Sequence, residues 1–214
     1  MRGTVRDVAK ASWLLNDVFK IYADNGEIEL VVVPDFTGND VVFDDAIKGV
    51  SAIIHLATVV TLDPDPNNVI PQTVAATTSL LKAALDEPSI KRFVYTTSYS
   101  AAAMPLERKD IVVGKDTWND LAVQLAWKQP YEPNNGLMVY MASKVAAEKE
   151  LWNFVKENKP HFSVNAVSPS AVIGQPITRQ HAVSNGAWLR LVYDGQAAVL
   201  SMIPQSKLIL KQHV

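Results

Sequence analysis

Short apolar runs alternate with helical segments along most of this chain. Runs rich in β-branched residues predict buried strands, and segments with apolar side chains three and four positions apart predict helices. The predicted strands are 28–33, 50–57, 92–97 and 163–168, and the predicted helices are 10–23, 69–86 and 144–156. Strands that alternate with helices imply a parallel sheet with helices on both faces. Such a sheet binds ligands at the carboxyl ends of its strands.

Two stretches depart from this alternation. Residues 101–135 are polar, contain Pro105, Pro130 and Pro133, and have little periodicity. They predict a long loop, and loops of this length are usually functional or mobile. After about residue 173 the pattern weakens, although 187–200 could form one more helix and a turn.

Composition narrows the class of protein. The 214 residues are 48% hydrophobic and 20% charged, as in an ordinary globular protein with one substantial core. The net charge of −2, without a basic stripe, argues against a nucleic-acid partner or a polybasic membrane anchor. The absence of cysteine excludes disulfides, thiolate nucleophiles and zinc–thiolate sites. With no apolar run near the ~20 residues of a membrane span and no signal-peptide pattern at the start, we expect a cytoplasmic protein without a metal site.

The most informative motif is the pair Tyr140 and Lys144. On a helix, residues four positions apart lie on the same face. A nearby ammonium favours the ionised phenol and so lowers the tyrosine pKa. A tyrosine of this kind can exchange a proton with a substrate oxygen. The spacing alone is weak evidence, because the chain has 6 tyrosines and a chance match arises in roughly one such chain in four. A surface pair on an amphipathic helix is the alternative.

Hydroxyl and small side chains stand at two predicted strand ends. Thr96, Thr97 and Ser98 stand at the end of the 92–97 strand, where a hydroxyl can donate a hydrogen bond to a substrate carbonyl. Local turn formation is the commoner role of such residues. Ala57, at the end of the 50–57 strand, would let a flat ring approach the backbone. We give His55 little weight as a catalyst, because no second histidine or carboxylate stands at ligand spacing.

Candidate nucleotide-binding residues lie near the start of the chain. Arg6, and with less support Lys10, could bind a phosphate, a task that suits the planar guanidinium of arginine. In dinucleotide-binding folds an arginine near the second strand accommodates the 2′-phosphate of NADP. Asp35 and Phe36, just past a strand end, could flank an adenine. Without further context, a solvated basic end is the commoner explanation for Arg6 and Lys10, and a turn would account for Asp35 and Phe36.

Taken together, these stretches resemble a known family. The matching segments are 5–7, 35–36, 49–57, 91–98, 117–119, 140–144, 147–152 and 165–169. In order and approximate spacing they resemble the extended short-chain dehydrogenases/reductases of the NAD-dependent epimerase/dehydratase superfamily. The resemblance is greatest to the branch of dihydroflavonol reductases and fungal NADPH-dependent aldehyde and ketone reductases. It implies a Rossmann-like doubly wound parallel sheet, and an NADP(H)-dependent ketoreductase or aldehyde reductase that reduces a small-molecule carbonyl to an alcohol. Secondary metabolism is the context that the resemblance implies.

The resemblance also implies a role for each matching residue. Tyr140 would protonate the carbonyl oxygen as hydride arrives from the cofactor, Lys144 would lower its pKa and hold the nicotinamide ribose, and Ser98 rather than Thr97 would bind the substrate oxygen. Arg6 and Lys10 would bind the 2′-phosphate, which favours NADP over NAD. The implied cofactor contacts are Arg6, Lys10, Asp35, Phe36, Ala57, Thr96, Tyr140, Lys144 and Pro169.

The chain departs from the family at its start. Relatives begin with a strand, a Gly-x-x-Gly-x-x-Gly turn and a helix, whereas residues 1–7 already match the second strand and the 9 glycines are scattered. The turn and the helix N-terminus normally bind the pyrophosphate. In the strand order 3-2-1-4-5-6 of such folds, the first strand lies between the second and the fourth. Without the first strand, the second and fourth would either flank a gap or pair with each other. We expect an incomplete NADP-binding domain over 1–175 and the start of a truncated substrate-binding portion over 176–214.

Several readings stay open at this point. The sequence could be an incomplete version of a working reductase, a truncated copy that folds without turnover, or a chain whose missing parts a partner supplies. Within the family, a nucleotide-sugar epimerase or dehydratase is the alternative reaction. The identity of the substrate and the oligomeric state cannot be read from these residues.

Overall fold

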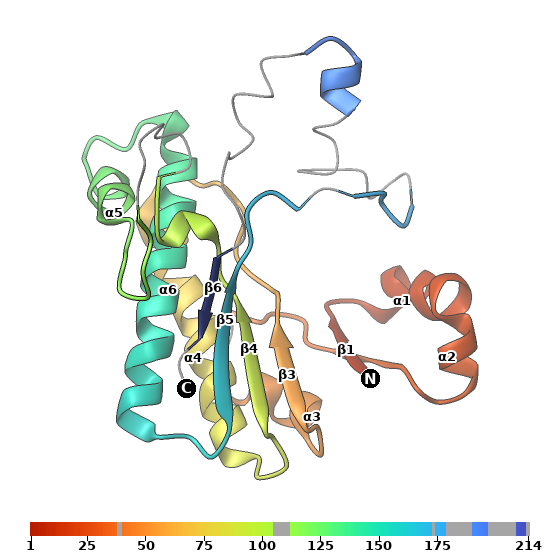
Figure 1. Cartoon of the computed structure of the whole chain (residues 1–214). Coiled ribbons are helices and arrows are strands. Elements are labelled where there is room, and N and C mark those ends of the chain that lie inside the picture. Colours follow the sequence, from red (N-terminus) through yellow and green to blue (C-terminus); the bar gives the residue numbers. More distant parts are fainter. Residues whose placement is uncertain (38–39, 105–111, 173, 179–189, 197–208, 213–214) are drawn as a thin grey trace.

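A computed structural model describes residues 1–37, 40–104, 112–172, 174–178, 190–196 and 209–212. The strands of these residues form two separate sheets (Figure 1). β1 (Arg2–Val5) pairs in parallel with β2 (Glu29–Val32). The larger sheet has the order β3-β4-β5-β6 and consists of β3 (Ala52–His55), β4 (Arg92–Thr96), β5 (Ser163–Ser168) and β6 (Ile209–Gln212).

The first three strands of the larger sheet run parallel, as predicted. β3, β4 and β5 are parallel, with His55 opposite Tyr95 and Tyr95 opposite Ala166. β6 is antiparallel to β5, an arrangement the sequence did not predict. No strand pairing joins β1 to β3 among the described residues. Of the two arrangements expected without a central strand, the structure therefore has the open one.

Two long helices cover one face of the larger sheet. α4 (Ile70–Asp86) and α6 (Gly136–Asn158) lie side by side behind β3–β5 (Figure 1). Alternate strand residues, among them Phe93 and Val164, point into the core that these helices close, where they meet Leu81 and Leu151. Burial of this apolar face supplies most of the stability of such a layer. On the opposite face Ile54 is 67% exposed, so the expected covering of both faces is not found at β3.

The region around β1 and β2 is packed more loosely. The predicted helix 10–23 is divided into α1 (Val8–Ala11), a π-helical turn η1 (Leu14–Val18) and α2 (Lys20–Asp24), none of which contains a buried residue. Ile21 is 68% exposed. A 3₁₀ turn η2 (Asp40–Phe43) and α3 (Asp44–Ile47) follow β2, and Phe43 and Ile47 do reach the main core.

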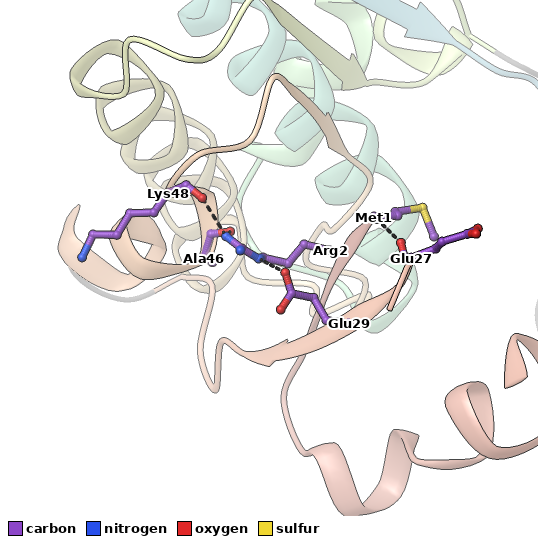
Figure 2. A network of polar contacts seen from close by, with 6 residues as sticks. All are labelled: Met1, Arg2, Glu27, Glu29, Ala46 and Lys48. Atoms are coloured by element: carbon purple, nitrogen blue, oxygen red, sulfur yellow. Dashed lines mark hydrogen bonds and ion pairs between the residues drawn. The ribbon is translucent and has the colours of Figure 1, made fainter. Parts of the chain in front are cut away.

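Arg2 connects β1 to the rest of the chain (Figure 2). Its Nε donates to Glu29 Oε1 at 2.8 Å, and its Nη1 donates to the carbonyl oxygens of Ala46 at 3.0 Å and Lys48 at 2.9 Å. The terminal ammonium of Met1 donates to the carbonyl oxygen of Glu27. A cation that binds carbonyls at a helix C-terminus is favourably placed. One guanidinium thus ties β1, β2 and the end of α3 together.

The segment predicted as a long loop contains a helix. α5 (Asp120–Ala126) begins at Asn119, whose Oδ1 accepts from the amide of Ala122 at 3.1 Å, as an N-cap residue does. Ala122 and Ala126 are buried on the side that packs against α6. The N-cap asparagine and the apolar spacing after it were the signals for this helix. A 3₁₀ turn η5 (Pro133–Asn135) then leads into α6.

α6 begins earlier than predicted, at a glycine. A Cβ built on Gly136 would lie 2.0 Å from the carbonyl oxygen of Leu62, a distance that no side chain tolerates. Leu62 itself has a φ of 54°, in the left-handed region that most residues avoid. The chain between β3 and a 3₁₀ turn η3 (Pro66–Asn68) is thereby fixed against the start of α6, and Tyr140 and Lys144 both fall inside the helix.

Candidate active site

Lys144 lies buried between α6 and β4. Its side chain is 2% exposed, and its Nζ donates to the carbonyl oxygen of Thr96 at 3.3 Å. The same nitrogen lies 5.9 Å from the centroid of the Tyr140 ring and 5.7 Å from that of Tyr95. The helix therefore brings the phenol and the ammonium to one place at the carboxyl end of β4. This geometry excludes the alternative of a surface tyrosine–lysine pair.

The protonation of this pair is governed mainly by burial. Burial lowers the pKa of Lys144 to about 8, and the negative charge of Glu148 acts against that shift. Burial raises the pKa of Tyr140, and a hydrogen bond with the Ser98 side chain acts in the opposite direction. The expected lowering of the Tyr140 pKa by Lys144 is therefore wrong for this structure, because loss of solvent outweighs the opposing hydrogen bond with Ser98.

Ser98 stands at the turn that follows β4. It caps a 3₁₀ turn η4 (Tyr99–Ala101), and its Oγ accepts from the amide of Ser100 at 3.2 Å and from the Ser100 hydroxyl at 2.8 Å. Ser98 thus makes the local turn that strand-end serines usually make. Because both bonds use it as an acceptor, its own proton stays available for the Tyr140 side or for a ligand.

Asn119 supports this turn from α5. Its Nδ2 donates to the carbonyl oxygen of Ser100 at 2.9 Å, and its backbone amide donates to the carbonyl oxygen of Ala101 at 2.9 Å. The side chain is buried. Asn119 was not a predicted site residue, although it lies in the matching segment 117–119 and just before an apolar helical pattern.

The Thr97 side chain is hydrogen-bonded to Glu148, a residue that was not among the predicted site residues. Its Oγ1 donates to Glu148 Oε2 at 2.8 Å, and both residues are buried. This bond turns the Thr97 hydroxyl toward α6, and the choice of Ser98 over Thr97 as the hydroxyl near the substrate stays a prediction. The spacing of Tyr140, Lys144 and Glu148 at successive intervals of four was the signal for Glu148.

His55 is a buried residue of β3. Its ring centroid lies 5.8 Å from that of Tyr95, and burial, with the charge of Lys144 as a smaller cause, lowers its pKa to about 4. It is therefore neutral at pH 7, consistent with the small weight given to it as a catalyst. No group of three or more possible metal ligands occurs among the described residues.

A cleft of about 1680 Å³ lies between β1 and β3. Residues along the whole of β1 and β3 line it, together with Glu29 of β2 and the residues after β2. The lining includes the predicted cofactor contacts Arg6, Lys10, Asp35, Phe36 and Ala57. Arg6 and Lys10 are exposed, and Lys10 Nζ lies 4.0 Å from Asp7. Asp35 accepts from the Thr37 amide and hydroxyl, which lowers its pKa.

The remaining predicted contacts lie outside this cleft lining. Thr96 offers its carbonyl to Lys144, and the carbonyl of Pro169 accepts from the Tyr99 amide at 3.0 Å. Next to Pro169, the buried Ser168 hydroxyl has no hydrogen-bond partner among the described atoms. The described residues contain no helix long and apolar enough to cross a membrane.

Comparison with known proteins identifies relatives of this chain. The model of the 3-beta hydroxysteroid dehydrogenase/isomerase family matches residues 3–183. The chain is 42% identical over 190 residues to the NAD-dependent epimerase/dehydratase terH of Aspergillus terreus, covering 88% of this chain and 55% of that protein. It is 33% identical over 210 residues to aldehyde reductase 2 of Sporidiobolus salmonicolor, covering 95% and 60%. The chain thus spans little more than half the length of these relatives.

Solved structures give the same fold. Gre2 of Candida albicans in complex with NADPH matches with a TM-score of 0.70 and 26% identity, over 87% of this chain and 55% of that one. A reductase engineered to attenuate substrate inhibition matches with a TM-score of 0.73 and 24% identity, over 90% and 58%. These matches confirm the Rossmann-like α/β fold predicted from the sequence. The chain belongs to the 3-beta hydroxysteroid dehydrogenase/isomerase family, among the extended short-chain dehydrogenases/reductases that its sequence resembles.

Proposed function

We propose that this chain carries the catalytic side chains of an NADP(H)-dependent carbonyl reductase that converts an aldehyde or ketone to an alcohol. The main support for this proposal is that the side chains of Ser98, Tyr140 and Lys144 lie close together at the carboxyl end of β4. Relatives named aldehyde reductase and ketoreductase support the reaction. The absence of cysteine is compatible with a cytoplasmic location, which we include in the proposal.

The protonation states suit a proton donor. A raised pKa keeps the Tyr140 hydroxyl protonated at neutral pH, which is the form that can protonate a carbonyl oxygen. Lys144, with a pKa of about 8, is mostly cationic at pH 7 and stabilises the phenolate that Tyr140 leaves behind. The Ser98 proton can bind the substrate oxygen and orient it toward Tyr140.

The described residues fit parts of an NADP molecule. The exposed cations Arg6 and Lys10 on the cleft wall suit a 2′-phosphate, and the small side chain of Ala57 leaves room for a flat ring. When bound, the nicotinamide cofactor supplies the hydride. The sequence contains no Gly-x-x-Gly-x-x-Gly turn for the pyrophosphate. We propose that residues 1–175 form the cofactor-binding part and that 176–214 belong to the substrate-binding part.

The test compares Tyr140→Phe with the wild type in the NADPH-dependent reduction of a panel of aldehydes and ketones. Loss of the general acid is expected to lower kcat by about 10²–10⁴-fold, while Tyr22→Phe, at an exposed position of α2, leaves kcat unchanged. Full activity of Tyr140→Phe would remove this residue from the mechanism. Thermal melting with NADPH tests binding separately, because a bound cofactor raises the midpoint.

The name of one relative favours a second candidate function. The protein from Aspergillus terreus is called an NAD-dependent epimerase/dehydratase, so a nucleotide sugar with NAD is the alternative substrate pair. Product analysis by mass spectrometry separates a new alcohol from an epimerised or dehydrated sugar. A chain that neither binds NADPH nor turns over either substrate would be a folded remnant without activity.

A further inference from the structure

A third charged residue continues the active-site face of α6. Tyr140, Lys144 and Glu148 are spaced four apart, so they lie one above another on the helix. Glu148 is 0% exposed. The proposed reaction uses the first two residues and gives no role to the third. A buried charge is costly unless it is paired and hydrogen-bonded, so its place beside Lys144 needs a reason.

Glu148 is hydrogen-bonded through both carboxylate oxygens. Oε2 accepts from Thr97 Oγ1 at 2.8 Å, and Oε1 accepts from Trp152 Nε1 at 3.4 Å. Thr97 immediately precedes Ser98, and its amide donates to the carbonyl oxygen of Val167 at 2.9 Å. The Glu148 carboxylate is therefore fixed in place, and it in turn fixes the strand end that carries Ser98.

The charge of Glu148 also acts on Lys144. The titratable groups around Lys144 are His55 from β3, Tyr95 from β4, and Tyr140 and Glu148 from α6. His55 is neutral at pH 7, and burial raises the pKa of both tyrosines, so they are neutral as well. Glu148 supplies the negative charge that raises the pKa of Lys144 against the effect of burial.

We propose that Glu148 is a positioning residue of this site, whose buried carboxylate keeps Lys144 cationic at neutral pH and holds the strand end that carries Ser98. Its catalytic meaning rests on the proposed function, whereas its coupling to Lys144 does not. A purely structural role would require only a hydrogen-bond acceptor of the right length. The charge and the shape of the side chain can be separated by two substitutions.

The direct test is an NMR titration of protein labelled with ¹³C,¹⁵N-lysine, with the Lys144 signal assigned from Lys144→Arg. In Glu148→Gln, which keeps the shape and removes the charge, the Lys144 midpoint is expected to fall by about 1–3 pH units. Glu148→Asp, which keeps the charge, is expected to shift it less. Glu157→Gln, on the exposed side of α6, is the matched control and leaves the midpoint unchanged.

Three results would overturn the proposal. They are an unchanged Lys144 midpoint in Glu148→Gln, a larger shift in Glu148→Asp than in Glu148→Gln, and a wild-type midpoint below pH 7. The last needs no variant of Glu148, so the proposal can be overturned even if Glu148→Gln fails to fold.

Turnover provides a further readout. If the wild type reduces a carbonyl, the high-pH decline of kcat in Glu148→Gln is expected to move to lower pH by the shift measured for Lys144, and lowering the pH restores the rate. An unmoved decline would contradict the proposal. If the wild type shows no turnover, the proposed function fails, while the titration still decides whether Glu148 sets the charge of Lys144.

Discussion

The region of β1 and β2 and the region of β3–β6 differ in how their helices are used. α4 and α6 bury an apolar face against β3–β5, with Leu81, Ala84 and Leu151 fully inaccessible to solvent. The segment from α1 to α2 buries no residue. Both regions contain parallel strands joined through helices. The larger sheet is held by the core that it forms with its two helices, whereas the smaller pair of strands reaches that core through Val31 and Val33 and adds the polar contacts of Arg2.

The largest expected difference between the regions is in the cost of removing an apolar side chain. Phe93→Ala removes a fully buried ring that stacks on Phe162 at a centroid distance of 6.2 Å, and should lower the free energy of unfolding by about 3–5 kcal/mol. Ile21→Ala, on the exposed side of α2, should change it by less than about 0.5 kcal/mol. Urea denaturation followed by circular dichroism measures both. Similar losses for the two variants would refute the contrast.

A smaller effect is expected from pH, and it belongs to the larger sheet. Burial depresses the pKa of His55 to about 4, so between about pH 6.5 and 4 the unfolded chain binds a proton that the folded chain does not. Stability should therefore fall as the pH is lowered through this window, by up to about 3 kcal/mol. Denaturation midpoints in His55→Gln should lose this slope, and those in His161→Gln should keep it. A slope unaffected by His55→Gln would assign the pH dependence to another group.

The smallest expected effect concerns the contacts of Arg2. Arg2→Ala removes its bonds to Glu29, Ala46 and Lys48, and local opening of β1 and β2 should become about 10-fold more frequent. Hydrogen exchange should therefore speed up in 2–5 and 29–32 and stay unchanged in 92–96. Arg92→Ala, which loses one long bond to Ser163 at 3.5 Å, serves as the control. Faster exchange in both sheets would mean that the two regions open together.

Most strands and the long helices of the larger sheet could be predicted from the sequence, because the spacing of apolar residues reflects which side chains are buried. The four predicted strands are β2–β5, and the predicted 69–86 helix is α4 within one residue. The 10–23 pattern was misleading, because none of its apolar residues is fully buried and the segment divides into short helices and a π-helical turn. α5 was missed because proline and polar residues around it hid a short helix that Asn119 caps.

The proximity of the candidate site residues could be predicted where it depends on the spacing of residues along one helix. Tyr140, Lys144 and Ser98 do meet, since α6 places the first two on one face and β4 ends beside them. The direction of the Tyr140 pKa shift was not predictable, because it depends on how deeply the phenol is buried. The contact of Glu148 with Thr97 was equally hidden, because it joins residues 51 positions apart.

The cleft between β1 and β3 has walls that belong to two sheets without common strand pairing in the described part of the chain. Backbone hydrogen bonds therefore do not set its width. A nucleotide that touched both walls would bind those protein molecules in which the two walls have the right separation. Its apparent affinity would therefore be reduced by the fraction of molecules in that conformation. A change that fixed this separation would then tighten binding without adding a single contact to the nucleotide.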